Sequence, residues 1–241
     1  LKRVYNELGG KSAFVVFDDF ADVERAAKTA AGSMFFNQGE SCNAPSRVLV
    51  HERIADRFVE IVAAEAPKYR AADPLDAGTE MGALVDEGQL KTVMGYIDAG
   101  KKEGARTVTG GTRARESSGG YYVEPTVFDR VDNGMTIARE EIFGPVMAVI
   151  PFDDEEEAYR LANDTPYGLA AAVWTRDIAK AHKFAASVRA GTVWVNCYDV
   201  FDAGAPFGGF KQAGMGRELG PDALEHYTEV KNVYYATGEP G

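Results

Sequence analysis

Hydrophobic residues near the start of the chain form two kinds of run. The stretch at 13–18, AFVVFD, is apolar over most of its length, which is typical of a strand buried on both faces of a parallel sheet. After Asp22, apolar residues recur at three- and four-residue spacings from Val23 to Phe35. This periodicity predicts a helix that Asp22 caps and that Gly39 ends.

The alternation continues to residue 196. Further apolar runs predict strands at 47–50, 146–152, 170–175 and 192–196. The runs at 107–111 and 121–128 bracket a stretch at 113–120 that is predicted to be a flexible loop. Amphipathic runs predict helices at 54–66, 89–104, 155–163 and 178–191. Strands that alternate with such helices imply right-handed crossovers onto one sheet, so the predicted fold class is α/β, a three-layer αβα sandwich with a mostly parallel sheet.

The pattern changes after residue 205. Residues 206–220 are too rich in glycine for regular structure, and a short helix and an exposed strand are predicted after them. We therefore expect one domain over 1–226 and a C-terminal strand and tail over 227–241. A terminal strand with an unpaired edge is often completed by a partner subunit, so the sequence predicts a homo-oligomer, a dimer or a tetramer.

Composition narrows the function classes. The 241 residues are 45% hydrophobic, which fits a packed core, and the net charge of -11 disfavours nucleic acid as a partner. No apolar run is long enough to span a membrane and no signal peptide is visible, so we expect a cytoplasmic protein without a membrane partner. The two cysteines are not spaced with histidines as metal ligands are, and no metal site is predicted.

The two cysteines differ in context. Cys197 alternates with Val193 and Val195, which predicts a small core residue on one face of a strand. Cys42 follows the end of a helix and lies in a polar loop, where backbone N–H groups can stabilise a thiolate. From these residues alone, Cys42 is as readily a nucleophile as a small residue in a turn.

A nucleophilic cysteine needs a group that handles its proton. The three histidines lie in ordinary positions, which leaves Glu7 as a candidate base because the paired glycines after it allow close backbone approach. The bland alternative for Glu7 is a solvated terminal charge. The adjoining GGKS at 9–12 lacks the earlier glycine and the strand of a phosphate-binding loop, and no dinucleotide fingerprint occurs elsewhere.

Four motifs in order carry a family resemblance. NELGGKS at 6–12, FFNQGESC at 35–42, EEIFGPV at 140–146 and PFGGFKQAGMGRELG at 206–220 resemble the aldehyde dehydrogenase superfamily over essentially the whole chain. WVNCYDVF at 194–201 and YTEVK at 227–231 are most similar to the cytosolic and mitochondrial aldehyde and retinal dehydrogenases. The resemblance implies oxidation of an aldehyde to a carboxylic acid with a nicotinamide cofactor.

The resemblance also implies site residues. Cys42 matches the nucleophile, which forms a thiohemiacetal and then a thioester, and Glu7 matches the base that activates the hydrolytic water. Glu141, Phe143 and Gln89 match positions that contact the nicotinamide half of the cofactor. The wall of the aldehyde tunnel is matched by Asp199, Phe201 and Phe207.

Parts of the family pattern lie outside this sequence. The N-terminal dinucleotide-binding domain and the asparagine of the oxyanion hole are not in the 241 residues, so the chain is expected to be the catalytic half of a longer enzyme. The resemblance favours NAD and does not exclude NADP. Two other functions stay open: a cofactor-independent esterase or thioesterase, and a non-catalytic assembly module.

Overall fold

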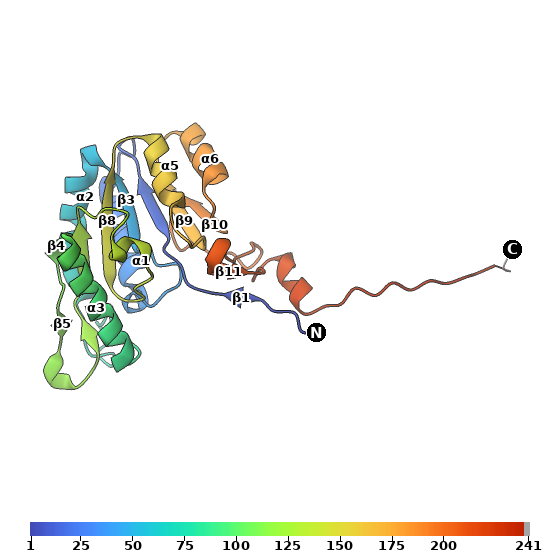
Figure 1. Cartoon of the computed structure of the whole chain (residues 1–241), viewed down its shortest axis with the longest axis horizontal. Helices are drawn as coiled ribbons and strands as arrows, with labels where there is room; N and C mark the ends of the chain where they lie inside the picture. Colours follow the sequence, from blue (N-terminus) through green and yellow to red (C-terminus); the bar gives the residue numbers. More distant parts are fainter. Residues whose placement is uncertain (239–241) are drawn as a thin grey trace.

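The structure is a computed structural model that describes residues 1–238. A seven-stranded sheet forms the centre of the protein (Figure 1). Its strand order is β10-β9-β2-β3-β8-β7-β4, and only the β4 and β7 pair is antiparallel. The strands are β2 (Ala13–Val16), β3 (Arg47–His51), β4 (Arg106–Thr109), β7 (Thr126–Asp129), β8 (Val146–Phe152), β9 (Ala170–Trp174) and β10 (Thr192–Val195). The predicted α/β class and mostly parallel sheet are confirmed.

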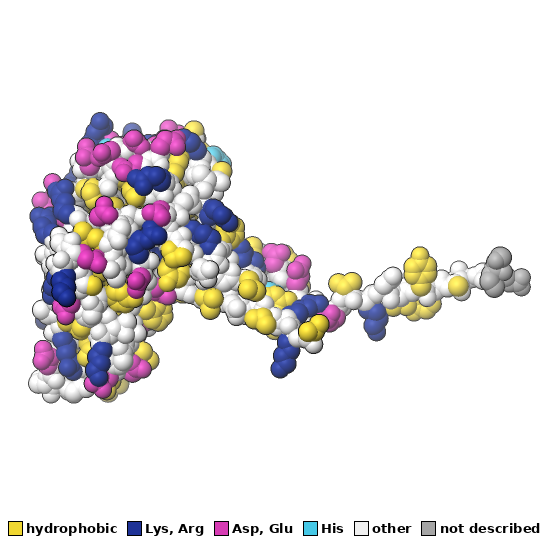
Figure 2. Space-filling view, in the orientation of Figure 1, with side chains coloured by type: hydrophobic (Ala, Val, Ile, Leu, Met, Phe, Trp, Pro, Cys, Tyr) yellow, Lys and Arg dark blue, Asp and Glu magenta, His cyan; other side chains and the backbone are white. Residues whose placement is uncertain are grey.

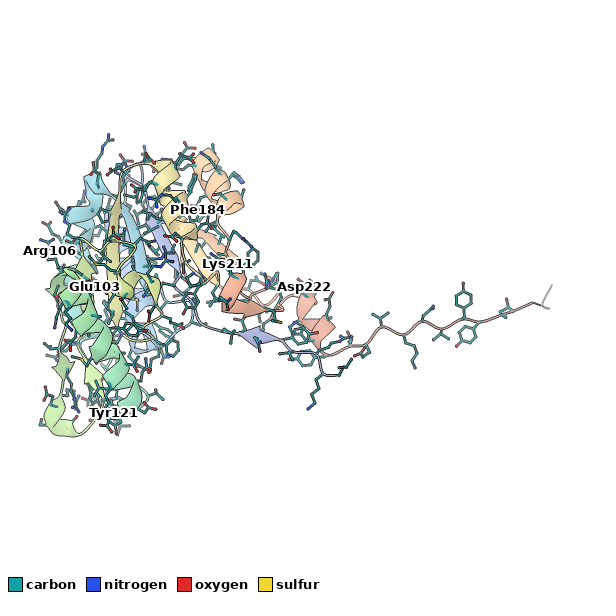
Figure 3. The ribbon with its side chains drawn as sticks, in the orientation of Figure 1. Glu103, Arg106, Tyr121, Phe184, Lys211 and Asp222 are labelled. Carbon is teal, nitrogen blue, oxygen red and sulfur yellow. The ribbon has the colours of Figure 1, made fainter. Side chains whose placement is uncertain are left out.

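Helices cover both faces of this sheet and complete the three layers. One core packs the sheet against α1 (Val23–Phe35) and α2 (Glu52–Glu65). The opposite core contains residues of α3 (Glu87–Glu103), α4 (Thr136–Arg139), α5 (Glu155–Asn163) and α6 (Ile178–Ser187). In Figure 3, Phe184 of α6 points toward the sheet, and this side chain is fully buried.

Local sequence explains these elements. All four residues of β2 are buried, with Phe14 and Val16 in one core and Ala13 and Val15 in the other, as period-two alternation requires. The Asp22 carboxylate accepts the Arg25 N–H at 3.0 Å and caps α1, as predicted. The register places β2 between β3 and β9, so the segment that enters β2 lies near the middle of the sheet.

Two segments from opposite ends of the chain run together beyond the sandwich. The short strands β1 (Asn6–Glu7) and β11 (Gly214–Met215) form an antiparallel pair, with Glu7 opposite Gly214. Figure 1 shows this pair where the N-terminal segment and the glycine-rich segment leave the body together. Gly214 has φ 133°, and a Cβ there would lie 2.0 Å from the Asn6 carbonyl oxygen. Glycine is therefore required for this approach.

The predicted terminal strand has no counterpart within residues 227–238 of the single chain, and its pairing with a partner subunit stays a prediction. The short 3-10 helix Pro221–His226 forms, but residues 227–238 contain no strand. A strand needs a hydrogen-bonding neighbour, and the tail extends away from the body without one in this chain (Figures 1 and 2). Residues 239–241 of the predicted strand lie outside the described part.

Three other predictions need correction. Cys197 packs against the α1–α2 core as expected, but Val193 packs against the opposite core, because β10 ends at Val195 and Asn196 has φ 56°. Helix α1 ends at Phe35 and not near Gly39, since Asn37 and Gln38 adopt left-handed conformations. The loop at 113–120 is partly ordered by β5 (Arg113–Ala114), which pairs with β6 (Tyr122–Val123).

Membrane-spanning helices and clusters of metal ligands are both absent from residues 1–238. None of the helices in residues 1–238 has the length and apolar character that a membrane crossing requires. Over the same residues, no cluster of histidine, cysteine and carboxylate side chains could hold a metal ion. Figure 2 shows basic and acidic side chains interspersed over the visible face of the body.

Candidate active site

Cys42 lies in a tight loop between the end of α1 and the start of β3. Gly39 begins the loop with φ 72°, and a Cβ there would lie 2.3 Å from the Gly144 carbonyl oxygen. The loop is closed by the Ala44 N–H, which donates to the Ser41 carbonyl at 3.1 Å. Cys42 is half-buried and forms no disulfide.

The paired glycines bring the N-terminal segment against this loop. A Cβ at Gly10 would lie 2.3 Å from the Cys42 carbonyl oxygen, and a Cβ at Gly9 would lie 1.9 Å from Glu141 Oε2. No other residue type fits either position without moving its neighbours. The Gly10 N–H donates to Glu141 Oε1 at 3.0 Å. The GG pair thus joins three motifs that are far apart in the sequence.

Glu7 is held near Cys42 by the pairing of β1 with β11. The next residue fixes the same segment, since the Leu8 N–H donates to the Ala213 carbonyl at 3.0 Å. Partial burial and the nearby Glu218 carboxylate raise the pKa of Glu7 above its usual value, and the Gly209 N–H opposes them. A raised pKa suits a carboxyl that exchanges protons near neutral pH.

The charge of Glu7 affects the pKa of the Cys42 thiol, so the two groups interact. Burial is the largest cause that raises the pKa of the Cys42 thiol, and the Glu7 charge is the next. Backbone N–H groups of Cys42 and Asn43 point at the sulfur and lower this pKa, but they do not outweigh burial. The resting thiol is therefore protonated near neutral pH and needs a base to become nucleophilic.

Glu141 and Phe143 lie in the segment that follows α4, and α3 holds this segment from one side. The Gln89 side-chain N–H₂ donates to the carbonyls of Ile142, at 3.0 Å, and of Phe143, at 2.7 Å. Phe143 has φ 54° and its side chain is 38% exposed, so the ring is presented at the surface. Gln89 thus positions the Phe143 backbone, and direct contact of Gln89 with a cofactor stays a prediction.

Asp199 supports the residue after the nucleophile. Its carboxylate accepts a hydrogen bond from the Asn43 side-chain N–H₂, while the buried Tyr198 hydroxyl donates to the Asn43 carbonyl at 2.6 Å. Burial raises the pKa of Asp199, and hydrogen bonds from Ser33 and Asn43 oppose this. The predicted tunnel residue therefore has a second task, which is to fix the Cys42 loop.

A cavity of about 520 Å³ opens beside this loop. The residues that line it come from α1 and the segments around Cys42 and Asp199: Gly32, Ser33, Phe36, Ser41, Asn43, Asp199 and Phe201. The Phe207 ring does not line the cavity but packs edge-on against Phe201, with centroids 5.5 Å apart. A cavity with aromatic walls beside a thiol suits a ligand with an apolar part.

Comparisons with known proteins agree with this geometry. The family model described as "Aldehyde dehydrogenase family" matches residues 1–233. The chain belongs to the aldehyde dehydrogenase family. Mitochondrial aldehyde dehydrogenase of Homo sapiens is 52% identical over 233 residues, which are 97% of this chain and 44% of that protein.

Solved structures of the family show the same fold. The aldehyde dehydrogenase KauB from Pseudomonas aeruginosa is 56% identical with a TM-score of 0.94, covering 95% of this chain and 46% of that one. The NAD+ complex of aldehyde dehydrogenase from Bacillus cereus is 47% identical with a TM-score of 0.94, covering 98% and 48%. The chain spans less than half the length of these family members.

Sequence reasoning missed several residues of the cavity. Gly32 and Ser33 lie inside the predicted helix but off its apolar stripe, and Phe36 directly follows the helix, so the sequence pattern gave them no role in a site. The signal available in the sequence is the pair Gly32–Ser33, which interrupts the alanines of the helix. In the structure, Phe36 is 66% exposed and lines the cavity just after α1.

Proposed function

We propose that this chain is the catalytic half of an enzyme that oxidises an aldehyde to a carboxylic acid with NAD. The observation that carries the proposal is the convergence of Cys42, Glu7 and Glu141 on the Gly9–Gly10 backbone. Residues 1–226 would form the catalytic unit, and a dinucleotide-binding half would complete the site. NAD is favoured over NADP because the Bacillus cereus relative is an NAD+ complex.

The chain's own residues suffice for the steps on sulfur. Glu7 accepts the thiol proton, and the Cys42 sulfur attacks the carbonyl carbon to give a thiohemiacetal. The N–H groups of Cys42 and Asn43 that point at the sulfur lie where they can also stabilise negative charge on the substrate oxygen. Loss of hydride to a bound nicotinamide would turn the thiohemiacetal into a thioester. Glu7, after passing the thiol proton to solvent, then takes a proton from water, which hydrolyses the thioester and releases the acid and the Cys42 thiol.

The residues around Glu141 fit the nicotinamide ribose half of the cofactor. A carboxylate fixed by the Gly10 N–H has acceptor capacity left for the two ribose hydroxyls, and the exposed Phe143 ring can flank the nicotinamide. A bound nicotinamide supplies the acceptor for the hydride that leaves the substrate carbon. Gln89 holds the Phe143 backbone during this step.

The tail beyond Tyr227 supports assembly with a partner. Val230, Tyr234 and Tyr235 are 99%, 93% and 81% exposed, in an extended segment without a strand neighbour in this chain. Exposed large apolar side chains of this kind mark interaction surfaces, so we propose that residues 227–241 pair with a second subunit in a dimer or tetramer. Cytoplasmic location stays a prediction, since one relative is a mitochondrial protein.

Hydrolysis of a nitrophenyl ester by the chain tests the roles of Cys42 and Glu7 without a cofactor. The wild-type chain should release nitrophenol continuously, and Cys42→Ala should release none. Glu7→Gln should also lose the activity, because neither the Cys42 thiol nor the hydrolytic water then has a base to accept its proton. Cys197→Ala is the matched control and should retain activity. A chain in which both cysteine variants behave alike would favour the assembly module.

The oxidoreductase reaction needs a separate measurement. Joined to a dinucleotide-binding half, the wild-type chain should form NADH from an aldehyde, and Cys42→Ala should not. Ester hydrolysis without any NADH formation in that assembly would favour the esterase or thioesterase alternative.

A further inference from the structure

Lys11 is a buried charge beside the site that the proposed mechanism does not use. Its side chain is 1% exposed and is among the largest fully buried ones. Within residues 1–238 its Nζ has no hydrogen-bond partner. A buried amine without a partner opposes folding, because it gives up its hydration for nothing in return. The position of Lys11 therefore indicates a role other than stability.

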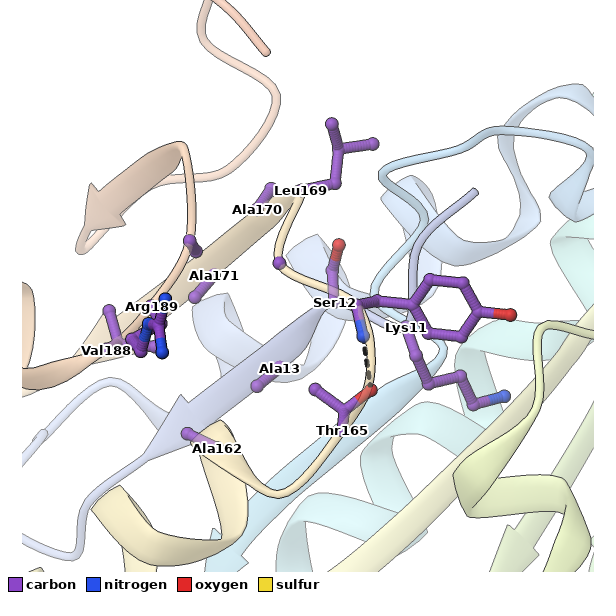
Figure 4. A pocket seen from close by; sticks show the side chains of 13 residues that line it. Lys11, Ser12, Ala13, Ala162, Thr165, Leu169, Ala170, Ala171, Val188 and Arg189 are labelled. Atoms are coloured by element: carbon purple, nitrogen blue, oxygen red, sulfur yellow. Dashed lines mark hydrogen bonds between the residues drawn. The ribbon is translucent and has the colours of Figure 1, made fainter. Parts of the chain in front are cut away.

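The backbone places Lys11 directly after the glycine that holds Glu141. Gly10 donates its N–H to Glu141 Oε1, and Lys11 lines a crevice together with Val188 and Ala190 of the α3–α6 core. Figure 4 shows Lys11 next to Ser12 and extending away from Val188 and Arg189. The narrow crevice drawn there also includes Thr165 and Tyr167 among its lining residues.

Charged groups from two segments act on the Lys11 amine. Glu141 and Glu140, after α4, favour its charged form, and Arg47 of β3 opposes it. Burial is the largest influence and lowers the pKa of Lys11 to about 7. Two tyrosines complete the cluster without adding charge near neutral pH. Tyr96 of α3 donates its hydroxyl to Glu140 Oε2 at 2.8 Å, and Tyr167 lies close enough to Glu141 for the carboxylate to raise its pKa.

The attraction acts in both directions, so the Lys11 charge also affects the pKa of Glu141. Burial raises the pKa of the Glu141 carboxyl, whereas first the Gly10 N–H and then the Lys11 charge lower it. The Gly10 N–H can only occupy Oε1, and it carries no net charge. Of the groups that lower the Glu141 pKa, Lys11 alone is a cation.

We propose that Lys11 is a positioning residue whose buried ammonium keeps Glu141 ionised and available to the nicotinamide ribose. The ribose part of this inference rests on the proposed function, and the effect on the charge of Glu141 does not. An ionised carboxyl accepts hydrogen bonds from both ribose hydroxyls, whereas a protonated one exposes a donor at one oxygen and loses an acceptor. Lys11 thus sets the lowest pH at which Glu141 is still ionised and can bind the cofactor.

Carbon-13 NMR of the chain labelled at glutamate carboxyls tests the effect on charge. Glu141→Gln assigns the Glu141 signal. In Lys11→Met and in Lys11→Gln the Glu141 midpoint should move to higher pH, because the counter-charge is gone. Lys91→Met is the matched control: this exposed lysine of α3 pairs with Glu87 at 2.9 Å and should leave the Glu141 midpoint unchanged.

A reciprocal measurement keeps the test decisive if the Lys11 variants do not fold. In Glu141→Gln, which leaves Lys11 in place, the midpoint of the Lys11 amine should fall below the wild-type midpoint, since linkage between two charges is mutual. An unchanged Glu141 midpoint in folded Lys11 variants would overturn the inference. So would an unchanged Lys11 midpoint in Glu141→Gln.

Cofactor binding is measured separately in the assembly that contains the dinucleotide-binding half. At a pH below the Glu141 midpoints that the NMR titration gives, Lys11→Met should raise the Kd of NAD tenfold for each pKa unit by which it raises the Glu141 midpoint. The loss should disappear as pH rises and Glu141 ionises without help. A Lys11 that only supports packing predicts a loss that does not vary with pH, which would also overturn the inference. Failure of the wild-type assembly to bind NAD would instead count against the proposed function.

Discussion

Replacing Lys11 by methionine should make the stability of the chain depend differently on pH. Methionine keeps the length and the apolar stem of lysine but removes the amine. In the folded chain the pKa of Lys11 is about 7, against 10.5 in the absence of its surroundings. Between these values the unfolded chain holds a proton that the folded chain does not. Wild-type stability therefore rises with pH in this window, and that contribution is absent from the variant.

The size of the effect follows from the difference between the two pKa values. The interval from about 7 to 10.5 corresponds to roughly 5 kcal/mol at about 1.36 kcal/mol per unit. Only part of this pH interval is convenient for unfolding experiments. Between pH 7 and pH 9, the difference in bound protons changes the free energy of unfolding by about 2 kcal/mol. For a chain of this length, each kcal/mol shifts the unfolding midpoint by about 2 to 4 °C, so the wild type should gain about 4 to 8 °C on the variant.

Thermal unfolding of both proteins, followed by circular dichroism at pH 7, 8 and 9, measures this gain. Lys11→Met should be the more stable protein at pH 7, and its advantage should shrink steadily toward pH 9. Lys91→Met, which removes an exposed lysine, should follow the wild type at every pH. A difference between Lys11→Met and wild type that stays constant with pH would refute the burial argument.

Four other predictions concern the site and its scaffold. Glu7→Gln should speed alkylation of Cys42 by iodoacetamide at pH 7.5, because the Glu7 charge raises the thiol pKa; an unchanged rate would mean that the two groups are not coupled. Gly10→Ala should cost about 1 to 3 kcal/mol and abolish ester hydrolysis, since its Cβ meets the Cys42 carbonyl. The matched Gly95→Ala in open space should stabilise α3 by roughly 0.5 to 1 kcal/mol in the same denaturant titration. Asp22→Ala should lower the free energy of unfolding by about 1 kcal/mol in urea titrations through loss of the α1 cap. Calorimetry of the isolated chain should detect no NAD binding, and micromolar affinity would contradict the need for a dinucleotide-binding half.

The layered fold could be predicted because its signals are local. The run at 146–152 has a strand pattern over its full length and forms β8 with those bounds. The predicted helix at 89–104 became α3, Glu87–Glu103, two residues earlier because Asp86 caps it by accepting the Gln89 N–H at 2.8 Å. Parallel order followed from the alternation of strands and helices. These features depend on neighbours within a few residues.

Features that depend on distant neighbours were not visible in the same way. The left-handed Asn37 and Gln38 end α1 early so that Gly39 can reach Gly144, a contact across more than a hundred residues. Asn196 ends β10 early, so Val193 and Cys197 pack against opposite cores and do not share one face. The predicted terminal strand depends on a neighbour that this chain does not provide.

The candidate site could be predicted only in part from local sequence. A local context marked Cys42 as exceptional, but only the family resemblance chose between a nucleophile and a residue in a turn. The structure then gave Gln89 and Asp199 tasks that spacing could not reveal, because Gln89 holds the Phe143 backbone and Asp199 holds the Asn43 side chain. A side chain that acts by holding another residue leaves no pattern of its own in a single sequence.

The sequence contains a signal for the burial of Lys11. GGKS resembles the end of a phosphate-binding loop, in which the lysine would reach outward to a ligand. Extending the period-two alternation of β2 backwards instead pairs Lys11 with Ala13 and Val15, which face the α3–α6 side. A lysine on a buried face of a central strand needs a nearby carboxylate. The glycines that precede it bring Glu141 close enough to meet that need, so one short motif places both the carboxylate and the cation that keeps it charged.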